Sequence, residues 1–354
     1  MNRLPLFETF PGLDVAIPHH HILRGPTPVS QAVTLGRRLG RDDLWIKHDD
    51  LTAEPYGGNK PRKLDFLLAD AARRGAESIL TTGGIGSNHC LATIVYGRSI
   101  CQEVHLLLFP QPITEHVRMS LALFSKLGAV IHPGRGYEEQ NDLIEALLAA
   151  HSGMYFIPAG GSNALGSLGF LNAGLELARQ VRDGVLPEPA AIYIAAGTSG
   201  SMAGLIAGCL LAGMRTRVIG VRVVDSVVTN PQTVLNLIHG MFDLLSQATG
   251  SFHPPEVKDN DIILEDAFLG AGYGAPTETG RNAAELFHDQ EGIQLEPTYT
   301  AKTAAAFLAA ARSAARGPLL FWNTFAGSVL SDLVTVSDLR GLPAFLRTLL
   351  NEGI

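Results

Sequence analysis

Residues 56–65 read Tyr-Gly-Gly-Asn-Lys-Pro-Arg-Lys-Leu-Asp, so two glycines lead directly into a lysine. Glycine lets the backbone approach a bulky ligand and adopt conformations closed to other residues. Because Pro61 suits the first turn of a helix, we expect Lys60 to lie at or just before a helix N-terminus. The helix dipole and the neighbouring Arg62 and Lys63 would favour the neutral, nucleophilic amine of Lys60. These features are typical of a Schiff-base lysine, and the alternative is a solvated lysine on a surface turn.

The composition indicates a compact α/β protein. The 354 residues are 46% hydrophobic and 17% charged, which allows one large or two ordinary domains with a substantial core. A formal charge of -7 gives no general attraction to nucleic acid or to an anionic membrane, so neither partner is expected. Three isolated cysteines, no recognisable signal peptide and no apolar run of membrane-spanning length predict a cytoplasmic protein.

Predicted strands and helices alternate along most of the chain. Short apolar runs predict strands at 43–48, 78–82, 104–109, 129–132, 155–158, 191–196, 217–224 and 318–322. Helical spacing fills most of the sequence between them, and it also predicts a first helix from Val29 to Leu39. Residues 251–275 are expected to be irregular, because proline and glycine interrupt them. This alternation predicts two open, twisted, mostly parallel sheets flanked by helices.

Small polar residues gather where several predicted strands end. They are Ser87-Asn88-His89, Gly160-Gly161-Ser162, Gly197-Thr198-Ser199-Gly200-Ser201 and Asn323-Thr324. Open parallel sheets bind ligands beyond the carboxyl ends of their strands, so these segments predict one polar crevice.

Residues 197–201 follow a strand and open a helix, which is the geometry that cradles a phosphate with backbone N–H groups. They do not form a Walker A loop, because no Gly-Lys-Ser/Thr follows. The alternative is a tight strand–helix turn without a ligand. A phosphate-bearing cofactor combined with a Schiff-base lysine points to pyridoxal 5'-phosphate.

Several further segments complete a pattern that extends from about residue 25 to 325. They are GGNKPRKLDFL (57–67), GSNH (86–89), IPAGGSNALGSLGF (157–170), GTSGSMAG (197–204), AGYGAPTETG (271–280), EPTYTAK (296–302) and NT (323–324). With these segments in order, the chain resembles the D-cysteine desulfhydrase/1-aminocyclopropane-1-carboxylate deaminase family. That family comprises pyridoxal-phosphate enzymes of the tryptophan-synthase β-like fold, fold type II.

The resemblance implies a cofactor site and a domain organisation. Lys60 would form the Schiff base and move the α-proton, and Asn59 would lie beside the cofactor. Residues 197–201 would hold the phosphate, Asn88 the 3'-oxygen, and Thr324 would face the pyridine nitrogen. A larger pyridoxal-phosphate domain (1–62 and 174–354) and a smaller α/β domain (63–173) would enclose the cofactor in the crevice between them. A homodimer is implied, and no residue is assigned to a metal.

The same resemblance implies which residues contact the substrate and which are catalytic. Ser87 and Tyr299 would be catalytic and contact the substrate, Tyr273 would be catalytic, and further substrate contacts would come from Asn88, His89 and Gly161. A threonine hydroxyl cannot protonate the pyridine nitrogen, so the cofactor would be a weaker electron sink that favours loss of a β-substituent. Tyrosine hydroxyls can protonate a departing thiolate. The alternatives are a helix cap for Ser87, core aromatics for the tyrosines and a strand-end cap for Thr324.

The function we expect is that of a lyase acting on a small β-substituted amino acid, with α,β-elimination from D-cysteine giving pyruvate, ammonia and sulfide. Ring opening of 1-aminocyclopropane-1-carboxylate, elimination from cysteate or another β-substituted amino acid, and a non-catalytic cofactor-binding or phosphate-binding protein are the alternatives. The sequence departs from the family pattern at Gly86, at Cys90-Leu91, at Ala301 and at Phe325. These departures flank the substrate rather than the phosphate, so the cofactor follows more directly from the sequence than the substrate does.

Overall fold

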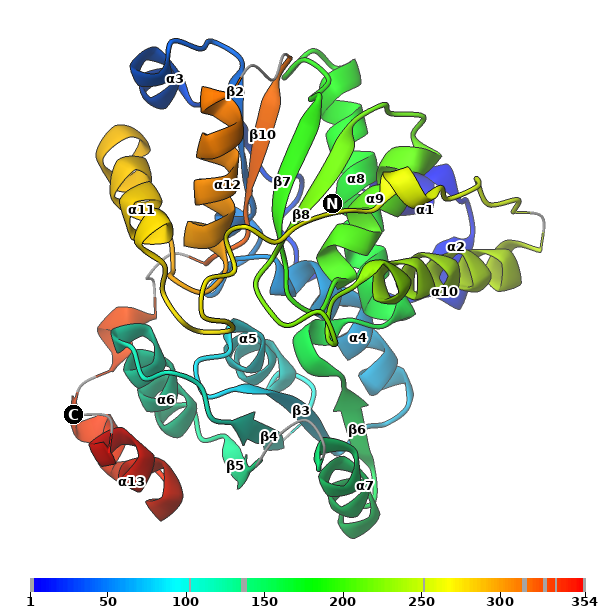
Figure 1. Cartoon of the computed structure of the whole chain (residues 1–354). Helices are drawn as coiled ribbons and strands as arrows, with labels where there is room; N and C mark the ends of the chain where they lie inside the picture. The colour runs from blue at the N-terminus through cyan, green and yellow to red at the C-terminus, as the bar shows by residue number, and fades with distance from the viewer. Residues whose placement is uncertain are drawn as a thin grey trace. The chain divides into compact units, whose positions relative to one another are not determined.

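The structure is a computed structural model that describes residues 3–101, 103–134, 139–250, 252–313, 317–326, 330–334 and 336–352. The chain forms two compact units (Figure 1). The first unit comprises Met1–Phe66 and Ser162–Gly327, and the second comprises Leu67–Gly161 and Ser328–Ile354. The division into a cofactor-binding domain and a smaller domain, with the boundaries expected above, stays a prediction.

The first unit is built on a six-stranded sheet in the order β1-β2-β10-β7-β8-β9. Its strands are β1 (Val29–Gln31), β2 (Leu44–His48), β7 (Ala191–Ala196), β8 (Arg217–Arg222), β9 (Ile263–Glu265) and β10 (Leu319–Asn323). Only β1 runs antiparallel to its neighbour, and every other pair in this sheet is parallel. The predicted mostly parallel sheet is therefore confirmed.

Helices cover both faces of this sheet (Figure 1). One face packs against α8 (Ala164–Arg182), α9 (Gly200–Leu211) and α10 (Pro231–Thr249), with α1 (Pro5–Thr9) and α2 (Leu13–Ala16) beside them. The other face packs against α3 (Val33–Leu39), α11 (Glu278–Glu291) and α12 (Thr300–Arg312). Residues of β10 alternate between the two cores, since Leu320 and Trp322 join the first core and Leu319 and Phe321 join the second. This period of two is that of a strand covered on both faces.

The predicted helix from Val29 to Leu39 is wrong over its first four residues. Val29–Gln31 form β1 and pair with residues 45–47 of β2, and α3 begins only at Val33. The backbone N–H of Ala32 donates to the carbonyl of Leu44, so the edge pairing extends to the start of the helix. An edge strand three residues long carries too little periodicity to be told from a helix turn. The short strand β9, inside residues 251–275, was missed for the same reason.

The second unit contains a four-stranded parallel sheet in the order β5-β4-β3-β6. Its strands are β3 (Ser78–Gly84), β4 (Glu103–Phe109), β5 (Val130–Pro133) and β6 (Met154–Ile157). Its helices are α5 (Asn88–Gly97), α6 (Glu115–Lys126), α7 (Gln140–Ala150) and α13 (Ala344–Glu352), and α4 (Lys60–Arg73) leads into it from the first unit. The expected second parallel sheet is confirmed.

Candidate functional site

Two positions in the turn before Lys60 accept only glycine. As predicted, α4 begins at Lys60. A Cβ at Gly57 would lie 1.9 Å from the carbonyl oxygen of Asp50. At Gly58, φ is +85° and a Cβ would lie 2.9 Å from the carbonyl oxygen of Thr324. Both positions therefore exclude a side chain, because the turn packs directly on neighbouring backbone.

Asn59 joins this turn to two other predicted site segments. Its backbone N–H donates to the carbonyl of Thr324 at 3.1 Å, which places the turn at the end of β10. Its side-chain Nδ2 donates to Ser201 Oγ at 3.1 Å, which ties it to the start of α9. The structure thus brings together Lys60, Thr324 and the loop at 197–201 within the first unit.

The loop at 197–201 connects β7 to α9 in the predicted strand–loop–helix order. Ser199 has φ of +64°, a conformation that is uncommon for a residue with a side chain. Its hydroxyl donates to Thr229 Oγ1 at 3.1 Å, and that hydroxyl in turn donates to the carbonyl of Gly197. A second chain segment therefore holds the loop in a shape that presents the amides at the N-terminus of α9, a favourable place for an anion.

Lys63 lies at the same loop, a role that sequence reasoning did not assign to it. Its Nζ donates to Ser162 Oγ at 2.9 Å. Ser162 Oγ is 2.7 Å from Thr198 Oγ1 and accepts from the N–H of Gly200 at 3.3 Å. Lys63 is buried, and burial together with the charge of Lys60 lowers its pKa well below the ordinary value. The spacing of three residues along α4, which places both amines on one helix face, was the available signal.

A polar cradle surrounds Gly200. A Cβ at this position would lie 2.6 Å from Ser162 Oγ, 2.7 Å from Lys63 Nζ and 2.9 Å from Ser167 Oγ. The buried hydroxyl of Ser167 has no hydrogen-bond partner among the described residues. Polar atoms from three segments thus converge on a position where the chain leaves out a side chain. An ammonium, hydroxyls and helix N-terminal amides together form a set of donors suited to a phosphate.

The two predicted tyrosines meet within the first unit. Tyr273 Oη and Tyr299 Oη are 2.8 Å apart, and the rings lie edge to face. A Cβ at Gly197 would lie only 3.2 Å from Tyr299 Cε1, so the Tyr299 ring packs against the loop at 197–201. Both hydroxyls therefore belong to the group of site segments that includes Lys60.

Glu296 fixes the position of Tyr299 and was also missed. Its buried carboxylate accepts from the backbone N–H groups of Thr298 at 2.8 Å, Tyr299 at 2.6 Å and Thr300 at 2.7 Å. These amides precede or open α12, where a helix has unsatisfied donors. Glu296 therefore caps the helix and holds the backbone of Tyr299.

A buried network of four charged side chains, called the ion tetrad here, is connected to the Lys60 turn through Arg62. Its members are Lys47, Asp49, Arg62 and Glu176. Arg62 donates to Asp49 Oδ1 at 2.7 Å and to Glu176 Oε2 at 2.9 Å, and Lys47 Nζ lies 2.5 Å from Glu176 Oε1. Trp322 Nε1 donates to Asp49 Oδ2 at 2.7 Å, which connects the tetrad to β10.

The two positive and two negative charges compensate one another. Burial raises the pKa of Glu176, but Arg62 and Lys47 more than reverse this and bring it to about 2. Burial lowers the pKa of Arg62, but Asp49 and Glu176 raise it above its ordinary value. Burial lowers the pKa of Lys47, and Glu176 only partly offsets this. The sequence did not reveal the tetrad, because Glu176, which joins Lys47 and Arg62, lies 114 residues from Arg62 in the chain.

Four predicted site residues, Ser87, Asn88, His89 and Gly161, belong to the second unit. Ser87 is the N-cap of α5, and its Oγ accepts from the N–H of Cys90 at 3.3 Å, so the capping alternative is realised. A Cβ at Gly83 would lie 2.6 Å from Ser87 Oγ, so a glycine at the end of β3 makes room for this hydroxyl. The catalytic role of Ser87 stays a prediction.

Asn88 opens α5, and the buried His89 follows it on the same turn. His89 Nε2 lies 2.9 Å from Thr81 Oγ1, which also donates to the carbonyl of Ile157. Gly161 has φ of +61° and ends the short turn after β6. These contacts hold the backbone of the turn after β3 and the turn after β6, and the substrate contacts of these residues stay predictions.

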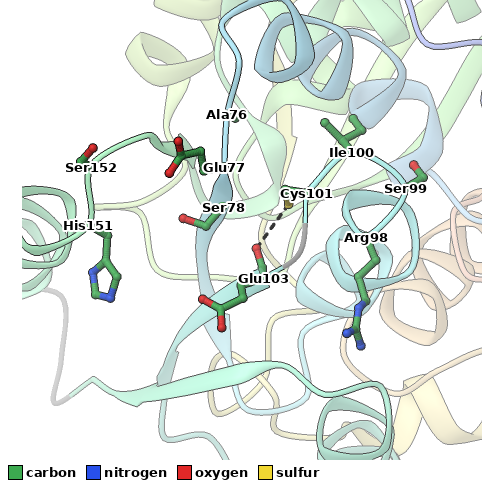
Figure 2. A pocket seen from close by; sticks show the side chains of 10 residues that line it. All are labelled: Ala76, Glu77, Ser78, Arg98, Ser99, Ile100, Cys101, Glu103, His151 and Ser152. Atoms are coloured by element: carbon green, nitrogen blue, oxygen red, sulfur yellow. Dashed lines mark hydrogen bonds between the residues drawn. The ribbon is translucent and has the colours of Figure 1, made fainter.

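A separate hollow of about 1030 Å³ opens in the second unit (Figure 2). Its lining includes Glu77, Ser78, Arg98, Glu103 and His151. Ser78 and Glu103 are the first residues of β3 and β4, so the hollow lies at the amino ends of these strands. The predicted ligand residues follow the carboxyl ends, so this hollow is not the candidate site.

Two further observations apply to the part of the chain that the structure describes. No helix there combines the length and apolar composition needed to cross a membrane. No group of three or more His, Cys, Asp or Glu side chains there is arranged to hold a metal ion.

Comparison with known proteins gives the same family as the sequence patterns. Two D-cysteine desulfhydrases of Klebsiella pneumoniae, from strain 342 and from subsp. pneumoniae, are each 34% identical over 322 residues, covering 87% of this chain and 93% of theirs. A crystal structure of an ACC deaminase homologue has a TM-score of 0.78 and 27% identity, covering 97% of this chain and 100% of that one. A threonine deaminase from Solanum lycopersicum, at a TM-score of 0.56 and 18% identity, covers 97% of this chain and 95% of its own and shows the fold alone.

The family described as "Pyridoxal-phosphate dependent enzyme" matches residues 22–324. This match confirms the predicted cofactor and, with the structural neighbours, the predicted fold. It covers the Lys60 turn, the polar cradle and both tyrosines. The chain belongs to the family of pyridoxal-phosphate dependent enzymes.

Proposed function

We propose that this enzyme catalyses the α,β-elimination of D-cysteine, in which one water is consumed and sulfide, pyruvate and ammonia are released. The observation that carries the proposal is the connected group in the first unit. Asn59 joins the Lys60 turn to Thr324 and Ser201, and the Tyr273–Tyr299 pair packs against the same loop. Support for the substrate comes from the relatives that are D-cysteine desulfhydrases.

The residues present fit the cofactor. The polar cradle around Gly200 offers a phosphate the Lys63 amine, the Ser162 hydroxyl and the Ser167 hydroxyl, which has no hydrogen-bond partner among the described residues. A bound phosphate would raise the lowered pKa of Lys63, because an adjacent anion favours the charged amine. We assign the phosphate to this cradle and the loop at 197–201, the aldehyde carbon to the Lys60 amine and the ring nitrogen to Thr324.

Pyridoxal phosphate, when bound, supplies an electron sink that stabilises negative charge at the α-carbon of the substrate. We assign the removal of the α-proton to the Lys60 amine. Its position at the start of α4 places it at the positive end of the helix dipole, which favours the neutral amine that this step needs. Thr324 would offer the ring nitrogen a neutral hydroxyl, and such a partner would leave the sink weak and favour early loss of the sulfur.

We assign the proton for the departing sulfur to Tyr299. The departing group is hydrosulfide, whose conjugate acid is stronger than a tyrosine hydroxyl with a pKa of about 10, so this transfer is uphill in water. The hydrogen bond of 2.8 Å from Tyr273 would stabilise the resulting phenolate and reduce that cost. The pair therefore acts as a general acid supported by a second hydroxyl.

The second unit supplies the remaining assignments that we propose. Ser87 and the amides of the first turn of α5 would bind the substrate carboxylate, because a helix N-terminus favours an anion. Asn88 would hydrogen-bond the 3'-oxygen of the cofactor, and His89 and Gly161 would border the substrate. We also propose that the first unit is the cofactor-binding domain and that the enzyme is a cytoplasmic homodimer. Light scattering of the purified holoenzyme tests the dimer.

Product analysis with both enantiomers of cysteine tests the proposed reaction. We expect sulfide and pyruvate in equal amounts from D-cysteine and much less of both from L-cysteine. 1-Aminocyclopropane-1-carboxylate is tested as an alternative substrate in the same assay, since its ring opening yields 2-oxobutyrate without sulfide. Formation of 2-oxobutyrate with no sulfide from D-cysteine would replace the proposal by a deaminase. Lys60→Ala is the control, and it should abolish product formation and remove the absorbance of covalently bound cofactor.

A further inference from the structure

Lys302 has surroundings that the proposed function does not explain. It lies on α12, one turn after Tyr299, and its side chain is fully buried. Its Nζ donates to the backbone carbonyl of Leu269 at 2.8 Å and to that of Gly272 at 2.9 Å. Burial lowers the pKa of Lys302, and the charge of Glu296 partly offsets this. A buried ammonium is costly unless its N–H groups find acceptors. Here two acceptors come from one turn of the chain, residues 269–272.

That turn carries Tyr273. Gly270, Gly272 and Gly274 have φ of +67°, +120° and +75°, so three left-handed glycines surround the tyrosine. Glycines lose more conformational freedom on ordering than other residues, so contacts from outside the turn help to hold its shape. The two carbonyls bound by Lys302 lie four residues and one residue before Tyr273 along the chain.

We propose that Lys302 is a positioning residue that holds the glycine-rich turn so that Tyr273 Oη meets Tyr299 Oη. Helix α12 then places both hydroxyls. Glu296 fixes Tyr299 through backbone amides, and Lys302 fixes Tyr273 through backbone carbonyls. A charged donor suits this task because its hydrogen bonds to carbonyls are roughly twice as strong as those of a neutral donor. The catalytic consequence rests on the proposed function of the tyrosine pair, whereas the contact itself does not.

The first test measures the turn directly. Hydrogen–deuterium exchange of the holoenzyme should show faster exchange of the peptide covering residues 266–276 in Lys302→Ala, with the cofactor absorbance retained. Methylammonium can occupy the vacated space and bind both carbonyls, so at tens of millimolar it should slow this exchange again, and equimolar sodium should not. Lys126→Met, at an exposed lysine of α6, is the matched control and should leave this peptide unchanged.

The second test separates positioning from general stability. In Lys302→Ala, kcat for D-cysteine should fall about ten- to a hundredfold with little change in KM, since small misplacement of a catalytic group has effects of this size. In a Tyr273→Phe background, the same substitution should cost less than about threefold, because the hydroxyl that it misplaces is already absent. Methylammonium should restore part of kcat only where Tyr273 is present.

The outcomes are distinguishable. Unchanged exchange of residues 266–276 in Lys302→Ala overturns the proposal whatever the substrate of the enzyme proves to be. Faster exchange with an undiminished effect on kcat in the Tyr273→Phe background also overturns it, because Lys302 would then act through something other than that hydroxyl. If the wild-type enzyme releases no sulfide from D-cysteine, the proposed function fails while the exchange experiment still decides the contact.

Discussion

Lys63 is the residue through which a single substitution tests the polar cradle. Lys63→Met keeps the length of the side chain and removes the charge next to Ser162 and Gly200. Loss of a hydrogen bond to a charged group costs about 1.5–3 kcal/mol, so the Kd for pyridoxal phosphate should rise roughly ten- to a hundredfold. Titration of the apoenzyme with cofactor, followed by absorbance, measures this. Lys126→Met should bind as the wild type does, and an unchanged Kd in Lys63→Met would remove Lys63 from the phosphate site.

Tyr299 offers a second test at the scale of one atom. Tyr299→Phe removes the proposed acid, so kcat for D-cysteine should fall by about 10²–10⁴ while the cofactor stays bound. Chloride leaves without needing a proton, so β-chloro-D-alanine should lose far less activity. Steady-state rates with the two substrates measure the difference. An equal loss with both would mean that Tyr299 serves binding or proton removal at the α-carbon instead.

At the scale of the helix, α12 depends on one buried carboxylate. Glu296→Gln replaces an acceptor of three backbone amides by a group with only one acceptor oxygen. An unsatisfied buried donor costs about 1–3 kcal/mol, so urea unfolding should show a loss of stability of this size. Glu278→Gln, at an exposed glutamate in the first turn of α11, is the matched control and should change stability little. A loss no larger than that of the control would contradict the capping role.

The sheet of the second unit contains a pH-sensitive pair. His105 Nδ1 on β4 lies 2.9 Å from His132 Nε2 on β5, and burial lowers the pKa of both imidazoles. The charge of Glu103 only partly offsets this at His105, and His105 and His151 lower the pKa of His132 further. Protonation is thus less favourable in the folded state than in the unfolded state. Stability is complete above the ordinary value of about 6.5 and falls as the pH drops through the lowered values.

This dependence can be measured with one variant. The urea midpoint of the protein should fall between pH 7.5 and pH 5, and His132→Gln should show a smaller fall because it keeps a polar group that does not titrate in this range. Identical pH dependence in the two proteins would assign the effect to other groups.

The ion tetrad sets stability at the scale of the whole first unit. Arg62→Met leaves Asp49 and Glu176 buried without their main partner, and breaking such a network costs about 3–5 kcal/mol. Because the pKa of Glu176 is about 2 in the fold and its ordinary value is 4.5, its contribution is present above pH 4.5 and is lost as the pH falls toward 2. Urea unfolding from pH 7 to pH 3 should show that Arg62→Met has the lower free energy of unfolding at pH 7. The difference between the variant and the wild type should shrink as the pH falls toward 3.

Local patterns predicted what depends on local physics. The alternation of strands and helices, the glycine turn before Lys60 and the strand–loop–helix at 197–201 could all be inferred from short segments. The place of Lys63 in the polar cradle could not, because Lys63 and Ser162 are 99 residues apart in the chain. The departure at Gly86 also has a tertiary cause, since a Cβ there would lie 2.8 Å from Val117 Cγ2 of α6. Such constraints become visible only when segments distant in sequence are placed side by side.

The place of β10 in its sheet has a consequence for biosynthesis. This strand is the last of the sheet along the chain, yet it lies between β2 and β7 and brings Trp322 to the ion tetrad. Until residues 319–323 leave the ribosome, β2 and β7 each keep an unpaired edge, and Asp49 lacks one of its donors. A nascent or truncated chain that stops before β10 is thus left with unpaired strand edges and an incompletely hydrogen-bonded charge cluster. Unpaired strand edges promote aggregation. The six-stranded sheet of the first unit is therefore completed only after β10 has been synthesised.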